Sequence, residues 1–330
     1  MTLALDKPRA GSPGGAVTVG PQDADRIGEI ARALAPVADG RIDTPEWVDA
    51  ARTAWCDLPV GLRRALRSFR RDSGPSGALL VRGLPVGEET LPETPTVRGS
   101  VQRTADVAAA VLLTVASGLG DPAAFRPEKT GALVQDVVPV PGQEDFQGNA
   151  GSVLLSFHTE NAFHPHRPDF VMLLCLRADH EGVAGLRTAC VRQVLPLLSD
   201  TSRTALQKEE FVTDAPPSFG SVPGAAAPHA VLTGAADDPD VRVDFAATRA
   251  TTRRAQSALD ELNRLFDLTA QTIRLTPGDL AIVDNRVTVH GRTSFRPRYD
   301  GQDRWLQRSF VLTDLRRSRG LRAQDGYVLD

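Results

Sequence analysis

The 330-residue sequence has few cysteines, few lysines and no long apolar run. Its three cysteines form no CxxC pair, which argues against a disulfide framework or a structural zinc site and favours a reducing cytoplasm. No segment approaches the roughly 18 uninterrupted apolar residues of a membrane span. Residues 1–20 lack the apolar stretch of a secretory signal, so we expect them to form a flexible tail.

A strong net charge is also missing. The chain has 38 basic and 41 acidic residues, a formal net charge of −3, which is not the basic footprint of a nucleic-acid-binding protein. Only Lys7, Lys129 and Lys208 are lysines, and the other 35 basic residues are arginines. Because a GC-rich coding bias accounts for most of them, the useful question is which few arginines bind a ligand.

Helical patterns dominate the first third of the chain and short β-like runs dominate the rest. Helices are expected over residues 22–34, 44–55, 60–72 and 104–117, with one strand over 77–84. Later strands are expected over residues 132–140, 152–157, 170–176, 241–245, 280–289 and 305–312, interrupted by one helix over 253–267. We therefore predict one domain over 21–330, mainly β with flanking helices, in which a helical part of about 21–125 decorates a β core of about 130–315.

One short motif carries potential metal ligands. His158 and Glu160 stand two residues apart, and on a strand such side chains share a face. With one more histidine they would form the 2-His-1-carboxylate triad, which binds Fe(II) and leaves coordination positions open for other ligands. The His-x-Glu pattern alone is common by chance and identifies no site.

The second half of the signal lies near the C-terminus. An apolar run opens with Pro-Gly-Asp and ends at Asp284 and Asn285, which should present His290 at the start of the next turn. Arg304 and Arg308 are four residues apart and share a face if this segment is a strand. A guanidinium buried inside a β core needs a carboxylate partner, either from an Asp or Glu of the chain or from a ligand.

These motifs together resemble one family. The segment HTENAFHPHRPDFVMLLCLRADHE from His158, the segment GDLAIVDN with the following HGR, and the Arg304/Arg308 pair are similar to the clavaminate synthase-like branch of the Fe(II)/2-oxoglutarate oxygenases. That branch includes clavaminate synthase and the β-hydroxylases of free arginine and asparagine. The resemblance implies a double-stranded β-helix (jelly-roll) core and hydroxylation of an unactivated C–H bond, at C3 or C4 of a free L-amino acid, in natural-product biosynthesis.

The resemblance also assigns roles to residues. It implies that His158, Glu160 and His290 bind Fe(II), with 2-oxoglutarate and O2 as cosubstrates. It places the distal carboxylate of 2-oxoglutarate on Arg304. It implies that the amino-acid substrate is bound by Arg308, Asp244 and Gln135.

Two departures from the family pattern bear on ligand binding. Leu186 stands where clavaminate synthase has a threonine for 2-oxoglutarate, so Thr188, two residues on, is the expected substitute. Arginine hydroxylases resemble one another in carrying two acidic residues two apart, whereas here Arg242 precedes Asp244 at that spacing. A positive charge there disfavours arginine as substrate and favours a neutral or amide side chain.

The remaining histidines match no ligand position. His164, His166 and His180 are expected at the surface or behind the ligands, and His229 is expected to be exposed. Three other functions stay open: the same chemistry on an aminoacyl group tethered to a carrier protein, desaturation or cyclisation instead of hydroxylation, and an inactive jelly-roll binding protein. No nucleic-acid or membrane partner is expected.

Overall fold

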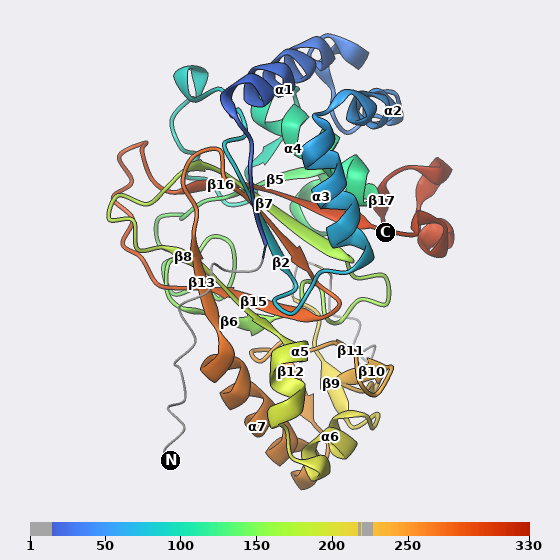
Figure 1. Cartoon of the computed structure of the whole chain (residues 1–330). Coiled ribbons are helices and arrows are strands. Elements are labelled where there is room, and N and C mark those ends of the chain that lie inside the picture. Colours follow the sequence, from blue (N-terminus) through green and yellow to red (C-terminus); the bar gives the residue numbers. More distant parts are fainter. Residues whose placement is uncertain (1–14, 217–218, 220–226) are drawn as a thin grey trace, which may run out of the picture.

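The computed structural model describes residues 15–216, 219 and 227–330 (Figure 1). Residues 1–14, which make up most of the expected tail, lie outside the described residues. The tail prediction is wrong for Ala16–Thr18, which forms strand β1 and pairs in parallel with β2 (Ala78–Arg82).

Two stacked sheets form the core, and the predicted jelly roll is confirmed. The larger sheet has the order β1-β2-β14-β7-β16-β4-β17, with β5 paired to β16 and β3 paired to β5, and the smaller sheet has the order β13-β8-β15-β6. The other strands of the larger sheet are β3 (Val101–Gln102), β4 (Asp121–Phe125), β5 (Val134–Val137), β7 (Phe170–Arg177), β14 (Leu280–Asp284), β16 (Trp305–Leu312) and β17 (Val328–Leu329). The strands of the smaller sheet are β6 (Leu155–His158), β8 (Gly185–Cys190), β13 (Gln271–Arg274) and β15 (Thr288–Arg292).

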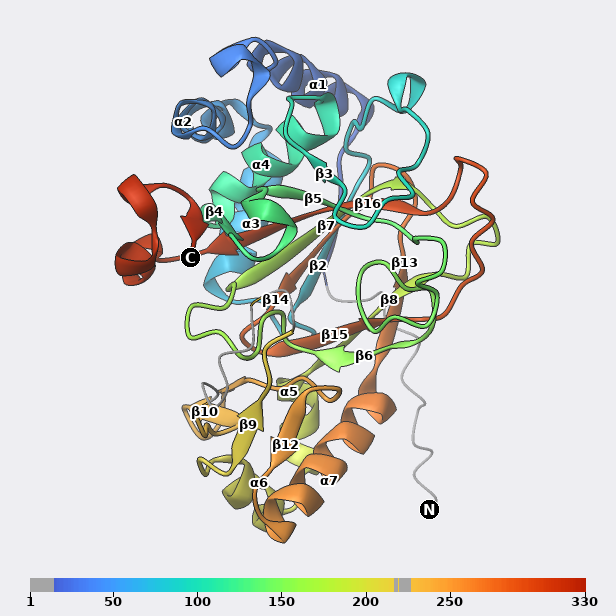
Figure 2. The ribbon, with the colours of Figure 1, turned by 180° about the vertical axis from the view of Figure 1, so that it is seen from behind.

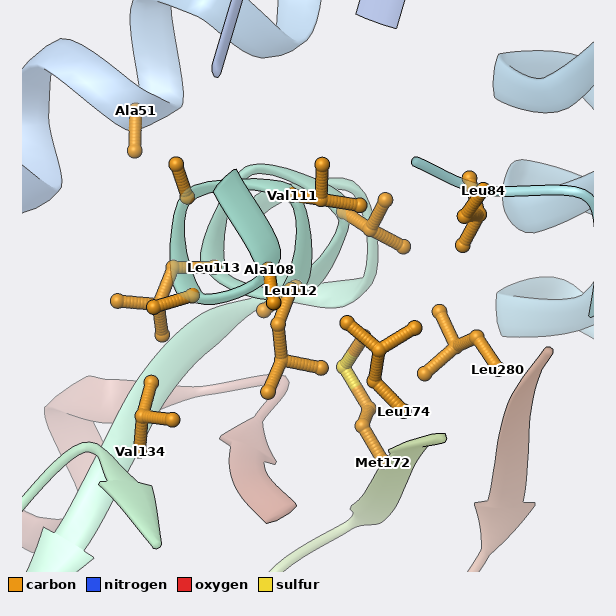
Figure 3. Packing of buried hydrophobic residues seen from close by; sticks show 14 of the residues in the cluster. Ala51, Leu84, Ala108, Val111, Leu112, Leu113, Val134, Met172, Leu174 and Leu280 are labelled. Atoms are coloured by element: carbon orange, nitrogen blue, oxygen red, sulfur yellow. The ribbon is translucent and has the colours of Figure 1, made fainter. Parts of the chain in front are cut away.

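Four helices lie on the outer face of the larger sheet, close to the predicted positions (Figures 1 and 2). They are α1 (Pro21–Leu34), α2 (Pro45–Ala54), α3 (Val60–Arg71) and α4 (Val107–Leu119). Helix α4 is apolar on every side because it lies between the sheet and the other helices, and Figure 3 shows its Leu112 beside Met172 and Leu174 of β7. No helix in the described part of the chain is long and apolar enough to cross a membrane.

Side chains of β7 and β16 alternate between the helices and the space between the sheets. Met172 and Leu174 belong to the helix-side core, whereas Val171 and Leu173 belong to the core between the sheets. On β16 the inward positions include Leu306 and Phe310. Arg304 and Arg308 have the same parity, so they point inward on one face, as the spacing predicts.

The expected single run over 280–289 is two strands in different sheets. β14 ends at Asp284 in the larger sheet, and β15 begins at Thr288 in the smaller one. His290 therefore lies in the middle of a strand, and the prediction that it opens a turn is wrong. Gly291 allows β15 to approach β6, since a Cβ atom there would lie 2.5 Å from the carbonyl oxygen of Leu155.

The described residues 191–216, 219 and 227–270 form a lobe between β8 and β13, at the bottom of Figure 1. The lobe has its own apolar core, in which Phe211, Leu262 and Phe266 pack toward Phe157 and Val289 of the smaller sheet. Helix α7 was predicted, but the strand expected over 241–245 ends at Val241. The elements are α5 (Val191–Val194), α6 (Asp200–Leu206), β9 (Phe211–Thr213), β10 (Leu232–Gly234), β11 (Pro239–Val241), β12 (Thr248–Ala250) and α7 (Arg253–Thr269).

Candidate active site

Three side chains of metal-ligand type converge at the end of β6. His158 is the last residue of β6, and the antiparallel pairing of β15 with β6 places His290 directly opposite it. Glu160 follows two residues later, with its Oε2 atom 3.4 Å from Nε2 of His290. One ligand atom from each of the three residues lies within 4.8 Å of the other two. The structure thus brings together the three residues predicted to bind the metal.

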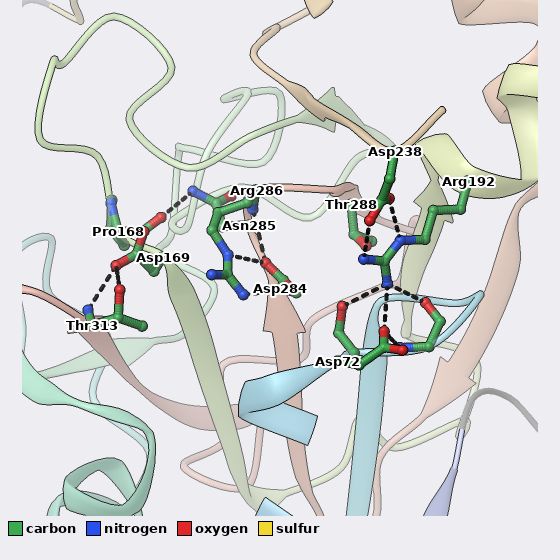
Figure 4. A network of polar contacts seen from close by, with 12 residues as sticks. Asp72, Pro168, Asp169, Arg192, Asp238, Asp284, Asn285, Arg286, Thr288 and Thr313 are labelled. Carbon is green, nitrogen blue, oxygen red and sulfur yellow. Dashed lines mark hydrogen bonds and ion pairs between the residues drawn. The ribbon is translucent and has the colours of Figure 1, made fainter. Parts of the chain in front are cut away.

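The position of Glu160 depends on a residue that the sequence analysis did not consider as support. Strand β6 ends at His158, so the expected strand alternation does not orient Glu160. The buried side chain of Asn285 does so instead: its Oδ1 accepts from the backbone N–H of Glu160 at 2.7 Å, and its Nδ2 donates to the Glu160 carbonyl at 3.1 Å. Nδ2 also donates to the carbonyl of Pro168 at 2.8 Å (Figure 4). The expectation that a strand orients Glu160 is therefore wrong, and its role as a metal ligand stays a prediction.

The ionisation states suit a divalent metal. The Nδ1 atom of His158 lies 2.9 Å from the carbonyl oxygen of Ser156, which leaves Nε2 for a ligand. Burial and the neighbouring His158 lower the pKa of His290, which favours the neutral imidazole that a metal needs. Burial opposes ionisation of Glu160, but Arg308 and His290 outweigh it, and its pKa is lowered. Two imidazole nitrogens and one carboxylate oxygen are the donors that suit Fe(II).

A narrow hollow beside the metal ligands is lined by buried arginines. Arg304 is 6% exposed, and no side chain or carbonyl in the described part of the chain accepts a hydrogen bond from its guanidinium. Arg292 lines the same hollow, and both guanidinium groups lie over the ring of Phe295, at 5.6 and 5.7 Å from its centre. Buried positive charge without a carboxylate is costly, so this hollow is built for an anion.

Leu186 and Thr188 of β8, the two positions compared for 2-oxoglutarate binding, differ in whether they line the narrow hollow. Leu186 lines the narrow hollow. Thr188 is buried and lies opposite His290 in the β8–β15 pairing, but it is not among the residues that line the hollow. A role for Thr188 in binding 2-oxoglutarate stays a prediction.

A larger hollow of about 580 Å³ is also lined by His158 and Glu160. Arg308 lines it and donates from Nη1 to Glu160 at 2.8 Å. Its Nη2 donates to Glu128 and, at 2.5 Å, to the side chain of Gln135. Gln135 therefore supports Arg308 from behind and does not line the hollow itself.

Two polar residues of this hollow were missed by the sequence analysis. The carboxylate of Glu128 pairs with Arg308. The side-chain amide of Asn149, in the orientation that satisfies both of its polar atoms, accepts from Nη1 and Nη2 of Arg308 at 3.2 and 3.1 Å. Neither residue belongs to a spaced motif. No sequence signal marks them; in the structure, Glu128 precedes two residues with a left-handed backbone, Lys129 and Thr130, with φ of 46° and 55°.

Asp244 lines the larger hollow, and an isolated antiparallel bridge joins it to His158. The side chain of Arg242 is directed elsewhere, since it donates to the carbonyls of Ala162 at 2.5 Å and Phe163 at 3.0 Å. Arg242 is not among the lining residues, so its charge does not face a ligand as we expected. Position 242 nevertheless lacks the second acidic residue expected of an arginine hydroxylase.

The other histidines hold no place among the metal ligands. His229 is 7% exposed and pairs with Thr213 at 2.8 Å, so the prediction that it is exposed is wrong. Burial lowers its pKa to about 4. His180 lies 3.2 Å from Asp300 and 3.6 Å from Asp303, but Asp303 already accepts hydrogen bonds from backbone N–H groups of its own turn. This second cluster is a turn, not a ligand site.

A jelly roll that joins two histidines and a carboxylate beside an arginine-lined hollow defines a class, the 2-oxoglutarate-dependent non-haem iron oxygenases. The sequence comparisons agree. The model of the family "Taurine catabolism dioxygenase TauD, TfdA family" matches residues 231–310. L-asparagine oxygenase of Streptomyces coelicolor is 66% identical over 95% of this chain and 94% of its own length. Clavaminate synthase 2 of Streptomyces clavuligerus is 37% identical over 83% of this chain and 86% of its own length.

Solved structures give the same result. Asparagine oxygenase in complex with Fe(II), 2S,3S-3-hydroxyasparagine and succinate has a TM-score of 0.93 and 66% identity, and the match covers 95% of this chain and 98% of that one. The oxygenase OrfP in complex with Fe and alpha-ketoglutaric acid has a TM-score of 0.87 and 29% identity, over 96% and 100% of the two chains. The chain belongs to the clavaminate synthase-like Fe(II)/2-oxoglutarate-dependent oxygenases, in the branch that hydroxylates free amino acids.

Proposed function

We propose that this enzyme hydroxylates C3 of free L-asparagine to give (2S,3S)-3-hydroxyasparagine. The observation that carries the proposal is the place of Asp244: it lines the hollow beside the metal ligands and is bridged to His158, while Arg242 is directed to backbone carbonyls. One carboxylate can accept from the neutral NH2 group of a side-chain amide, whereas a guanidinium carries a positive charge and five N–H donors. The 66% identity to L-asparagine oxygenase over nearly the whole chain supports the same substrate.

The opposite side of the hollow suits the α-carbon of an amino acid. The guanidinium of Arg308 would bind the α-carboxylate, and the carboxylate of Glu128 would accept from the α-ammonium group. The side chains of Gln135 and Asn149 hold Arg308 in place for this role. A free α-carboxylate is absent from an aminoacyl group tethered to a carrier protein, so this use of Arg308 favours the free amino acid.

The metal ligands and the narrow hollow serve the cosubstrate. His158, Glu160 and His290 would hold Fe(II), which with 2-oxoglutarate and O2 supplies the oxidation of a C–H bond and leaves succinate and CO2. Arg304 would bind the distal carboxylate of 2-oxoglutarate, because its guanidinium is buried and has no partner in the described part of the chain. The hydroxyl of Thr188 is our candidate for a second contact.

The test is turnover with a panel of free L-amino acids. The purified protein is supplied with Fe(II), 2-oxoglutarate and O2, and succinate and the amino-acid product are both measured. We expect asparagine to stimulate succinate formation most strongly, with a product one oxygen atom heavier that matches a (2S,3S)-3-hydroxyasparagine standard. Arginine and lysine should give little stimulation.

The alternatives give distinct results in the same assay. A product two hydrogen atoms lighter would show desaturation or cyclisation. Stimulation by an asparaginyl carrier protein but by no free amino acid would overturn the free substrate. Replacement of His290 by alanine should abolish both turnover and iron binding, and turnover that survived in this variant would refute the metal centre.

A further inference from the structure

Arg292 lies between the two hollows. It is the last residue of β15, two positions after His290, and it is 4% exposed. It lines the narrow hollow together with Arg304. Its Nη1 and Nη2 donate to the carbonyls of Gly148 and Val153 at 3.3 and 3.1 Å, and no atom of the described residues accepts from its Nε. A charge is therefore buried with backbone carbonyls as its partners.

The two carbonyls belong to a segment that walls the larger hollow. We call residues 144–153 the wall segment, because Phe146, Gln147, Gly148, Asn149 and Ala150 all line that hollow. Asn149 also lines the narrow hollow and lies against Arg308. The guanidinium of Arg292 thus lines the narrow hollow and at the same time donates hydrogen bonds to the segment that walls the larger hollow.

The chain between β15 and β16 reinforces the same connection. We call residues 293–303 the connector, and Arg304 follows it directly. The backbone N–H of Phe295 donates to the Ser152 carbonyl at 3.0 Å, and the Tyr299 hydroxyl donates to the Glu144 carboxylate at 2.5 Å. Arg292, the connector and the wall segment therefore form one contact network between the two hollows.

An anion in the narrow hollow changes the energy of this network. Arg292 and Arg304 flank the same ring, and their positive charges repel in a buried environment. A carboxylate bound between them relieves that repulsion and holds both guanidinium groups in place. A ligand in the narrow hollow that stabilises one arrangement of the wall segment makes binding of a second ligand to that arrangement more favourable, because the segment is already ordered.

We propose that Arg292 is a positioning residue that couples the two hollows, so that 2-oxoglutarate in the narrow hollow fixes the wall segment and tightens binding of the amino acid. The proposal rests on the proposed function for the identity of the two ligands. It assigns to Arg292 two separable parts, a charge that attracts the cosubstrate and a pair of donors that hold the wall segment.

Anaerobic calorimetry with the Fe(II)-loaded protein tests the coupling without turnover. In the unmodified enzyme, saturating 2-oxoglutarate should tighten asparagine binding by about ten-fold. Arg292→Met should abolish this tightening and weaken 2-oxoglutarate binding by about ten-fold. Arg292→Lys should retain most of the affinity for 2-oxoglutarate but lose the tightening, because one ammonium group does not span both carbonyls.

Arg322→Met is the matched control. Arg322 is also a buried arginine that donates to backbone carbonyls, at 2.9 Å to Leu315 and 2.5 Å to Gly326, but it lines neither hollow. Unlike Arg292, it also pairs with a carboxylate, that of Asp325, at 2.8 Å. It should change thermal stability and leave the coupling intact. Independent binding of the two ligands in the unmodified enzyme, or unchanged coupling in Arg292→Met, would overturn the proposal.

Hydrogen exchange separates this inference from the choice of substrate. Addition of 2-oxoglutarate alone should slow amide exchange across residues 144–153 in the unmodified enzyme and in Arg322→Met, but not in Arg292→Met. Suppose that asparagine binds to none of these proteins, but that 2-oxoglutarate protects residues 144–153 in all of them except Arg292→Met. The substrate assignment would then fail, and the role of Arg292 would stand. Protection that was equal in Arg292→Met would overturn that role.

Discussion

Asn285 holds Glu160 by both of its backbone groups, through one accepted and one donated hydrogen bond at 2.7 and 3.1 Å. Asn285 directly follows β14, whereas Glu160 lies just beyond β6, so the amide joins the two sheets at the metal centre. The position of Glu160, the proposed carboxylate ligand, is therefore set by the turn between β14 and β15, not by the strand that carries His158.

Replacement of Asn285 by aspartate should weaken iron binding by about 10- to 100-fold, the usual cost of losing a group that orients a metal ligand. The new carboxylate oxygen would face the carbonyls of Glu160 and Pro168, where Nδ2 now donates. Iron affinity is measured by competition with a chelator. Asn263→Asp on α7 is the control and should keep normal iron affinity; an equal loss in both variants would contradict the role of Asn285.

Replacement of Arg304 by methionine should have opposite effects on stability and on cosubstrate binding. The guanidinium is buried without a carboxylate, so its removal should leave thermal stability unchanged or higher in the absence of ligand. The dissociation constant for 2-oxoglutarate should rise by about 100-fold or more, because the bidentate contact is lost. Unfolding curves and calorimetry check the two effects, and a less stable protein with normal 2-oxoglutarate affinity would count against the assignment.

Replacement of Asp244 by asparagine should shift the side-chain preference from asparagine toward aspartate. The carboxylate of Asp244 accepts from an amide and repels another carboxylate, whereas an amide at this position can donate to a carboxylate. We expect the ratio of kcat/KM for the two substrates to change by about 100-fold, that is, by about 2.7 kcal/mol. An unchanged ratio would mean that Asp244 does not meet the substrate side chain.

Stability should fall as the pH drops from about 6.5 to 4, in part because the buried His229 and the half-buried His164 must become protonated. Burial lowers the pKa of His229 and of His164 to about 4, below the value of about 6.5 in an unfolded chain. Their contribution is thus complete above pH 6.5 and is lost as the pH falls toward 4, by about 1–3 kcal/mol each. His229→Gln should show a smaller loss over this range in urea unfolding; an identical pH dependence would contradict the pKa direction for His229.

The parts of the site that could be predicted from the sequence are those encoded by short-range patterns. The parity of Arg304, Leu306 and Arg308 places all three between the sheets, and the first half of the apolar run over 280–289 is strand β14. Glu128 and Asn149 follow no such pattern. Glu128 reaches Arg308 because it lies between β4 and β5, which both pair with β16, and Asn149 does so because the wall segment folds back over the hollow. Both are contacts between residues far apart in the sequence.

The lobe shows a second limit of local patterns. Helices α5 and α6 span four and seven residues, too few to show a helical repeat, and β9 to β12 have three residues each. Their structure depends on burial against α7 and the smaller sheet. The direction of the Arg242 side chain also depends on contacts with a distant segment. Asp244, two residues later, lines the larger hollow, whereas Arg242 donates to the carbonyls of Ala162 and Phe163.

The backbone bridge between His158 and Asp244 fixes the distance between these two residues. Around it, the N–H of Thr159 donates to the Val243 carbonyl at 2.7 Å, and the N–H of Phe245 donates to the Phe157 carbonyl at 3.1 Å. Backbone pairing, not side-chain packing, therefore fixes how far His158, the proposed metal ligand, lies from Asp244, the proposed contact of the substrate side chain. Side-chain substitutions can change the chemical group that is accepted, but a substrate one carbon longer calls for a different register between these two segments.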